Sequence, residues 1–278
     1  MNLKNAFRDL KDQLRNGTKT GPFDRKQIRQ VFEFADTRRH IAGLDDPRLK
    51  HFLDFAFSLA SKTQSQIFQD AFVLYVLNSK SGGFFCDFGA TNGYDLSNSY
   101  ALETSFGWKG ICAEPARNWH EALKKNRPNA RIETDCVWTE TGLSLTFSES
   151  RHKELSTLTD FANSDSHARK RKNSLEYDVT TISLNGLLKK HKAPEKFDYL
   201  SMDTEGSELA ILQSFDLKKW MPKILTIEHN YTPSRTAIYD MITAAGYTRV
   251  LTDISCFDDW YLAPGYELPE INSAHIQK

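Results

Sequence analysis

Short apolar runs alternate with segments of helical periodicity along most of the chain. Apolar runs of about four to eight residues that are bounded by turn signals are typical of strands buried on both faces of a parallel sheet. Runs of this kind predict strands at 84–88, 111–114, 131–137, 143–147, 177–182, 196–203, 224–229, 248–251 and 260–262. Between them, the spacing of apolar positions predicts helices at 65–77, 95–106, 118–126, 183–191, 208–215 and 236–245. This alternation predicts an α/β fold with a mostly parallel sheet.

The first 62 residues have a different pattern, because they are polar and their apolar residues form helical stripes. One stripe consists of Leu3, Phe7, Leu10 and Leu14, and a later helix is expected at 46–61. We find no catalytic combination of residue types here, so we expect the segment to cover the core domain or to pair subunits in a homo-oligomer. The predicted division is a helical extension at 1–62, an α/β domain at 63–265 and a tail at 266–278.

Composition and charge exclude several classes of protein. The 278 residues include 36 Lys and Arg against 36 Asp and Glu, so no global field attracts nucleic acid or an anionic membrane. The four cysteines have no Cys-x-x-Cys spacing, which favours reduced thiols in the cytoplasm. The N-terminus lacks the apolar stretch of a secretory signal, and no apolar run is long enough to cross a bilayer. We expect a cytoplasmic protein with no nucleic-acid partner and no integral membrane segment.

Acidic residues close four of the predicted buried strands. They are Asp87, Glu114, Asp203 and Glu228. In a doubly wound sheet the carboxyl ends of the strands meet along one edge, where ligands bind. Close carboxylates repel one another and buried ones must be paired, so this edge requires a cationic ligand, a metal or a proton. The sequence therefore predicts a site at this edge.

The turn after the first strand narrows the choice of ligand. Asp87 closes the strand, and Gly89 and Gly93 follow with Thr91 between them. A dinucleotide turn carries Gly-x-Gly-x-x-Gly, so Thr91 breaks that fingerprint. An acid at this turn suits a ligand with positive charge and hydroxyls, such as S-adenosylmethionine, although a plain strand cap is the alternative. Glu114 ends the next strand where a carboxylate can hold ribose hydroxyls, and a surface cap is its alternative.

The segment at 148–176 is polar and has no clear periodicity. Loops of this length in compact domains are usually functional lids or disordered segments. It includes the basic run at 169–172, which could bind a phosphate or an acidic glycan group. A solvated, charged loop is the commoner case for such a run.

Several short motifs occur together and in a fixed order between about residues 64 and 262. They are Ser65, Gln66, Gln69 and Asp70; residues 87–90 with Asn92 and Gly93; Ser97, Asn98 and Ser99; Leu102 and Glu103; residues 107–110; Glu114 and Pro115; residues 203–208; and Ile227 with Glu228. In this combination the chain resembles the FkbM family of S-adenosylmethionine-dependent methyltransferases. The resemblance implies the class I methyltransferase (Rossmann-like) fold, a seven-stranded sheet with the last strand antiparallel. It also implies methyl transfer to oxygen, commonly to a hydroxyl of a sugar or of a polyketide-like product.

The resemblance also implies roles for single residues. The methionine and ribose parts of the cofactor would be held by Asp87, Gly89, Ala90, Gly93 and Asn98. Glu114 would bind the ribose hydroxyls, and Asp135 would accept a hydrogen bond from the adenine amino group. Asp203 and Glu205 would lie under the transferable methyl group.

Some related O-methyltransferases hold a divalent metal with such acids. Asp203, Glu205 and Glu228 are therefore candidate ligands for Mg²⁺, which prefers oxygen. A sugar hydroxyl is a poor acid, so it needs a base within hydrogen-bond reach. The first candidates for this base are Asp203 and His229, followed by Glu228 or Glu205. A hydrogen-bonded structural role is the alternative for His229.

The functional hypothesis is O-methylation of a small-molecule or glycan acceptor, such as a sugar, a glycolipid or a related secondary metabolite. A second hypothesis is a nucleotide-sugar NAD-dependent oxidoreductase, against which Thr91 and Asp87 argue. A third is a cofactor-binding scaffold without catalysis, which the intact acids at the later strand ends disfavour.

Overall fold

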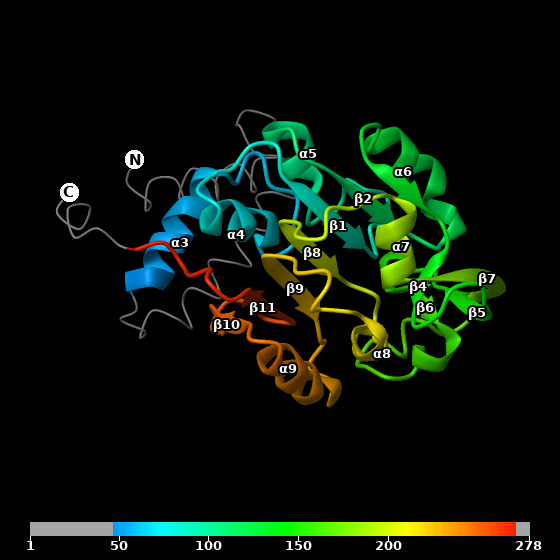
Figure 1. Cartoon of the computed structure of the whole chain (residues 1–278). Helices are drawn as coiled ribbons and strands as arrows, with labels where there is room; N and C mark the ends of the chain where they lie inside the picture. Colours follow the sequence, from blue (N-terminus) through cyan, green and yellow to red (C-terminus); the bar gives the residue numbers. More distant parts are fainter. Residues whose placement is uncertain (1–46, 271–278) are drawn as a thin grey trace, which may run out of the picture.

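The computed structural model of the protein describes residues 47–270 (Figure 1). The expected helical stripe that begins at Leu3 lies outside the described residues, as does most of the predicted tail. The remaining part contains one large sheet, a smaller sheet beside it and helices on both faces of the large sheet. Within residues 47–270, no helix combines the length and the apolar character needed to cross a membrane.

The large sheet has seven strands in the order β10-β11-β9-β8-β1-β2-β3. In chain order the strands are β1 (Phe84–Phe88), β2 (Lys109–Ala113), β3 (Arg131–Glu133), β8 (Tyr199–Met202), β9 (Ile224–Glu228), β10 (Thr248–Val250) and β11 (Asp258–Leu262). β11 runs antiparallel to both of its neighbours, while the other paired strands are parallel. The seven-stranded sheet with an antiparallel last strand is therefore confirmed, and that strand is second from the edge.

Helices cover both faces of this sheet. They are α3 (Pro47–Ser58), α4 (Gln69–Val76), α5 (Tyr100–Phe106), α6 (His120–Asn126), α7 (Leu184–Lys190), α8 (Glu208–Ser214) and α9 (Ser234–Ala244). One apolar core joins α3, α4, α5 and α6 to the sheet, and the other joins α7, α8 and α9. Phe52 of α3 packs edge-on to Trp260 of β11, so α3 shares an apolar core with the sheet.

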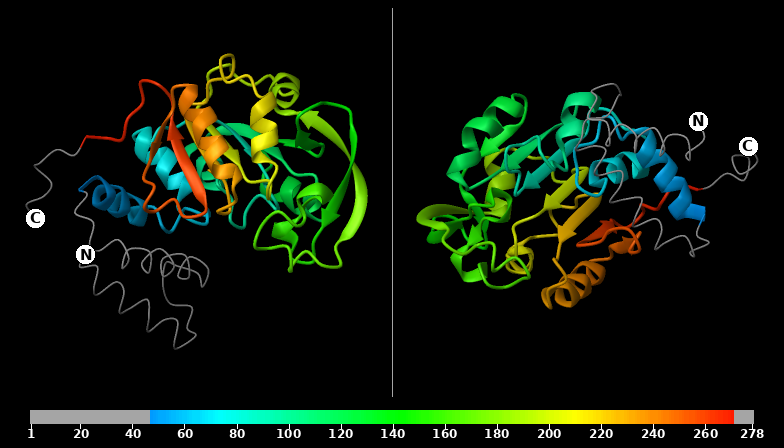
Figure 2. Two further views of the ribbon diagram at one scale, coloured as in Figure 1. Left: turned by 90° about the horizontal axis from the view of Figure 1, so that it is seen from below. Right: turned by 180° about the vertical axis from the view of Figure 1, so that it is seen from behind.

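The smaller sheet lies at the end of the molecule away from α3, as two views agree (Figures 1 and 2). Its strand order is β4-β7-β5-β6, from β4 (Cys136–Trp138), β5 (Ser144–Glu149), β6 (Thr157–Leu158) and β7 (Leu175–Ser183). Between β5 and β7 the chain forms what we call the lid segment, residues 150–174. It contains β6 and two short 3-10 helices, η2 (Lys153–Leu155) and η3 (Thr159–Phe161).

Two of the predicted elements are wrong in their extent. The strand expected at 131–137 is two strands in different sheets, because the Glu133 carboxylate accepts the backbone N–H groups of Thr134 and Asp135 and turns the chain there. The helix expected at 95–106 begins only at Tyr100. Before it, the Asn92 side chain caps a turn and Leu96 has a φ of 58°, which no helix accommodates.

Candidate functional site

A cavity of about 470 Å³ opens at the carboxyl ends of β1, β2, β8 and β9, with the lid segment on its other side. This volume lies within the range of small-molecule and cofactor sites. Five predicted site residues on the first two strand ends and the segment between them line it: Asp87, Gly89, Ala90, Asn98 and Glu114. Asp203, Glu205 and Glu228 complete the acidic wall, so the four strand-end acids meet as the topology required.

Asp87 is buried at the end of β1 and accepts a hydrogen bond of 2.5 Å from the Ser99 hydroxyl. Burial raises the pKa of Asp87, and the Ser99 hydrogen bond and the nearby positive charge of Arg127 oppose that rise. These partners favour the charged form of the carboxylate at the edge of the cavity.

Arg127 is a residue that sequence reasoning missed. It follows α6, is fully buried, and donates from Nε to Glu103 at 2.6 Å. Its other nitrogens donate to the Ser97 hydroxyl at 3.2 Å and to the Ser99 hydroxyl at 3.0 Å. One guanidinium thus fixes the start of α5 against the turn behind Asp87. Glu103 belongs to one of the motifs in which the chain resembles the FkbM family. It was the only feature of the sequence that could have indicated the ion pair between Arg127 and Glu103.

The glycines of the turn have different neighbours. Gly89 has a φ of +82°, and a Cβ on it would lie 1.6 Å from the Asp203 backbone oxygen, so only glycine lets the turn meet the end of β8. Gly93 does not line the cavity; a Cβ there would lie 2.5 Å from the Arg127 side chain. Gly93 therefore makes room for the Arg127 side chain instead of contacting the cavity.

Asn98 and Ala90 lie in the wall of the cavity. The Asn98 amide donates to the Ser201 hydroxyl at 3.0 Å, and its buried Oδ1 has no hydrogen-bond partner in the described part of the chain. A buried acceptor of this kind is costly unless a ligand satisfies it.

Glu114 follows β2 and is held on both carboxylate oxygens. It accepts from the backbone N–H of Thr91 at 2.8 Å and from that of Ala116 at 2.8 Å. Burial nevertheless raises the pKa of Glu114 to about 7. Asp135, by contrast, lies outside the cavity lining, and its carboxylate is 3.7 Å from Lys190 Nζ.

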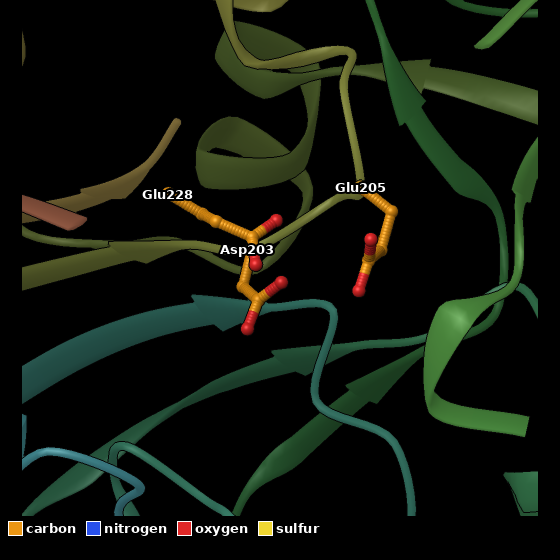
Figure 3. A group of neighbouring side chains, drawn as sticks. All are labelled: Asp203, Glu205 and Glu228. Atoms are coloured by element: carbon orange, nitrogen blue, oxygen red, sulfur yellow. The ribbon is translucent and has the colours of Figure 1, made fainter. Parts of the chain in front are cut away.

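Asp203, Glu205 and Glu228 form an acidic cluster that we call the acid triad (Figure 3). One carboxylate oxygen of each lies within 4.8 Å of the others. Burial, then the negative charge of Glu208, raises the pKa of Asp203 to about 7. Burial, then the charge of Asp203, raises the pKa of Glu205 to about 9, and the pKa of Glu228 is well above its usual range for the same reasons.

The chain turns sharply between Asp203 and α8. The Glu208 carboxylate accepts from the Thr204 N–H at 2.8 Å and from the Gly206 N–H at 3.1 Å. Glu205 has a φ of 59°, a conformation that few residues adopt and that this hydrogen bonding maintains. The turn places Glu205 beside the other two acids, and Gly206 and Glu208 are the residues that form it.

The lid segment is joined to the acid triad by Arg171. Its guanidinium donates to Glu205 Oε2 at 2.6 Å and to the two oxygens of Asp165 at 2.7 and 2.8 Å. Arg171 is therefore buried, and the expectation of a wholly solvated basic run is wrong for this residue. Its neighbour Lys170 lines the cavity.

His229 follows β9 but does not line the cavity. Its Nδ1 accepts the backbone N–H of Tyr231 at 3.0 Å, and its Nε2 lies 3.7 Å from Asp259. Burial lowers the pKa of this imidazole. Because its Nδ1 is engaged in this hydrogen bond, the surroundings of His229 favour a structural role, which was the alternative to a catalytic one. Asn230, one residue further, lines the cavity instead.

The antiparallel strand β11 is inserted second from the edge of the sheet, and the cavity lies at the carboxyl ends of the parallel strands. Together, this strand order and this position of the cavity define the class I methyltransferase fold. The methyltransferase FkbM domain model matches residues 87–249, more than half of the chain. The chain belongs to the FkbM methyltransferase family.

Solved structures of methyltransferases are similar to this chain at low sequence identity. Methyltransferase FkbM from Methylobacillus flagellatus KT is 11% identical with a TM-score of 0.44, over 84% of this chain and 59% of that chain. The chain thus spans about three fifths of that protein's length. An O-methyltransferase from Bacillus cereus in complex with SAH is 12% identical with a TM-score of 0.41, over 82% of this chain and 97% of that chain. A search of curated protein sequences gave no match.

Proposed function

We propose that the protein transfers a methyl group from S-adenosylmethionine to a hydroxyl of a sugar, a glycolipid or a related secondary metabolite. One observation carries this proposal: the acids of four strand ends converge on a single cavity in a chain of the FkbM family. Several carboxylates in one buried place require positive charge, and a sulfonium with an α-ammonium group supplies it. When bound, S-adenosylmethionine supplies an activated methyl group, so the protein has to bind, align and deprotonate the acceptor.

The first two strand ends would hold the cofactor. Asp87 and the unsatisfied Asn98 Oδ1 offer a charged and a neutral acceptor to an ammonium or hydroxyl group. Glu114, fixed by two backbone N–H groups, retains free lone pairs for a ribose diol. Gly89 and Ala90 line the cavity beside them and would contact the cofactor. Asp135 has less support as a cofactor-binding residue because it lies outside the cavity lining.

Asp203 is the best-supported base. Its carboxylate lines the cavity, and its pKa of about 7 is close to a physiological pH, where a base is both available and effective. His229 is disfavoured because its ring lies outside the lining. Glu205 is less suited than Asp203 to act as the base, since Arg171 occupies one of its oxygens.

The acid triad also has the donor set for a hard divalent cation. Its three oxygens lie within 4.8 Å of one another, and Glu228 Oε2 has no hydrogen-bond partner in the described part of the chain. Asp203, Glu205 and Glu228 would hold Mg²⁺, which would lower the pKa of the acceptor hydroxyl. The ion pair of Glu205 with Arg171 competes with such a metal.

Calorimetric titration tests the cofactor assignment. We expect S-adenosylmethionine and S-adenosylhomocysteine to bind and NAD to give no heat of binding. Binding of NAD without binding of S-adenosylmethionine would instead favour the oxidoreductase. Cofactor binding with no methyl-group product in any extract would favour the non-catalytic scaffold. The acceptor would then be sought by mass spectrometry, as a product that is heavier by one methyl group.

A thermal-shift titration with MgCl₂ tests the metal independently of activity. We expect Mg²⁺ to raise the melting temperature of the wild type and to leave Glu228→Gln unchanged. Equal shifts in both proteins would show that Mg²⁺ acts elsewhere on the molecule.

A further inference from the structure

Basic side chains line the same cavity, and all of them come from the lid segment. They are His152, Lys153, His167 and Lys170. The acids of the lining come from the strand ends and the turns that follow them, with the single exception of Glu154. The cavity therefore has an acidic wall on the sheet and a more basic wall on the lid segment.

These basic groups are available to a ligand. Among the described residues, the side chains of His152 and Lys170 make no hydrogen bond or ion pair. Lys153 Nζ lies 5.1 Å from the centre of the Trp119 ring, a contact that leaves its donors free. His167 lies near Asp165, whose charge Arg171 already balances.

The lid segment is fixed relative to the acid triad, so the position of these groups is defined. Arg171 binds Glu205 at 2.6 Å, directly beside Lys170 in the chain. The Thr157 hydroxyl donates to the backbone oxygens of Thr204 at 3.3 Å and Glu205 at 3.1 Å. A group bound by Lys170 is thereby held against the wall that the lid segment contributes to the cavity.

This arrangement has an electrostatic consequence for the acceptor. A neutral sugar would leave the lysines unpaired, whereas an anion among the strand-end acids would be repelled. Resting on the proposed function, we propose that the acceptor carries an oxyanion, a phosphate or a carboxylate, and that Lys170 and Lys153 bind it with His152 and His167. The acceptor hydroxyl then lies toward the acid triad while the anion lies toward the lid segment. Lysine acts here as a point-charge donor to the oxyanion.

The test measures binding of acceptor-like probes to the protein saturated with S-adenosylhomocysteine. The probes are glucose, glucose 1-phosphate, UDP-glucose and glucuronate, of which the last three carry an oxyanion. We expect at least one of these three to bind about 10-fold tighter than glucose, because a hydrogen bond to a charged group contributes about 1.5–3 kcal/mol. The pattern among the three distinguishes phosphate from carboxylate.

Matched variants test whether Lys170 is a residue that binds the anion. Lys170→Gln should weaken binding of the preferred anion about 10-fold and leave the affinity for S-adenosylhomocysteine unchanged. Lys172→Gln, an exposed lysine of the same run that does not line the cavity, should change neither. Binding of glucose as tight as that of the anions, no binding of any anion, or equal effects of the two substitutions would overturn the proposal. Failure of S-adenosylhomocysteine to bind would instead count against the proposed function.

Discussion

Each carboxylate of the cavity has its own set of partners, and these decide what it can do. Glu114 accepts two backbone N–H groups, which fix its orientation while leaving lone pairs for a diol. Asp87 has a hydroxyl partner and a nearby guanidinium, which keep its charge available. Asp203 is buried beside other acids, so burial and then the charge of Glu208 raise its pKa to about 7, and it is suited to accept a proton.

We expect Asp87→Ala to lower the affinity for S-adenosylmethionine by about 100-fold, since a charged hydrogen bond contributes about 1.5–3 kcal/mol. Calorimetric titration measures this directly. Asp178→Ala, at an acid on β7 that does not line the cavity, is the control and should bind normally. Unchanged affinity in Asp87→Ala would remove Asp87 from the cofactor site.

We expect Asp203→Asn to leave cofactor affinity within about 3-fold of the wild type and to lower the rate of methyl transfer by about 100-fold or more, the usual contribution of a general base. The amide keeps the shape of the side chain but cannot accept the proton. Single-turnover transfer from labelled S-adenosylmethionine, beside a binding titration, separates the two effects. An active Asp203→Asn protein would exclude Asp203 as the base.

At the scale of elements, buried arginines fix the two loops that form the cavity. Arg127 joins the end of α6 to the start of α5 through Glu103 and Ser99. Arg171 joins the lid segment to the turn after β8 through Glu205. Removing one partner of a buried ion pair leaves an uncompensated charge, whereas replacing both is often tolerated.

The Arg127 pair gives a prediction on stability. Arg127→Met should lower the free energy of unfolding by about 3–5 kcal/mol, because Glu103 is left buried without its partner. The double variant Glu103→Gln with Arg127→Met should recover a large part of that loss. Urea denaturation of the wild type and the variants measures both. A double variant no more stable than Arg127→Met would show that packing of the Arg127 side chain, and not the charge pair, is what matters.

At the scale of the whole molecule, the acid-lined cavity makes stability depend on pH. Asp203 and Glu114 have a pKa of about 7 and Glu205 a pKa of about 9, all above their ordinary values. A raised pKa means that the folded state binds the proton more tightly than the unfolded chain. The stability from these groups is complete below about pH 4 and is lost as pH rises through about 7 and 9.

We therefore expect the protein without cofactor to melt at least roughly 5 °C lower at pH 9 than at pH 6, since each unit of pKa shift is worth about 1.4 kcal/mol. Glu228→Gln should reduce this difference because one repelling acid is removed. Glu121→Gln, an exposed acid on α6, is the control. Thermal melts over this pH range measure the effect. A melting temperature that rises toward pH 9 would contradict it.

Most of the sheet could be predicted because each strand is a local signal. The buried strands near Asp87, Glu114, Asp203 and Glu228 appear in the structure with ends shifted by only a few residues. The strand expected at 131–137 failed because Glu133 turns the chain through its own side chain, a contact that apolar periodicity does not reveal. For the site, family motifs indicated the cavity acids, but they did not distinguish Gly93 from Gly89.

The sequence by itself determined that strand-end acids meet at one edge, because the order of parallel strands brings their carboxyl ends together whatever the details of packing. Only the tertiary structure decided the partners of those acids. Arg127 and Glu103 are 24 residues apart, and Arg171 and Glu205 are 34 apart. Over such separations the choice of partner depends on how helices and loops pack. The same packing turned His229 away from the cavity and brought Lys170 to it.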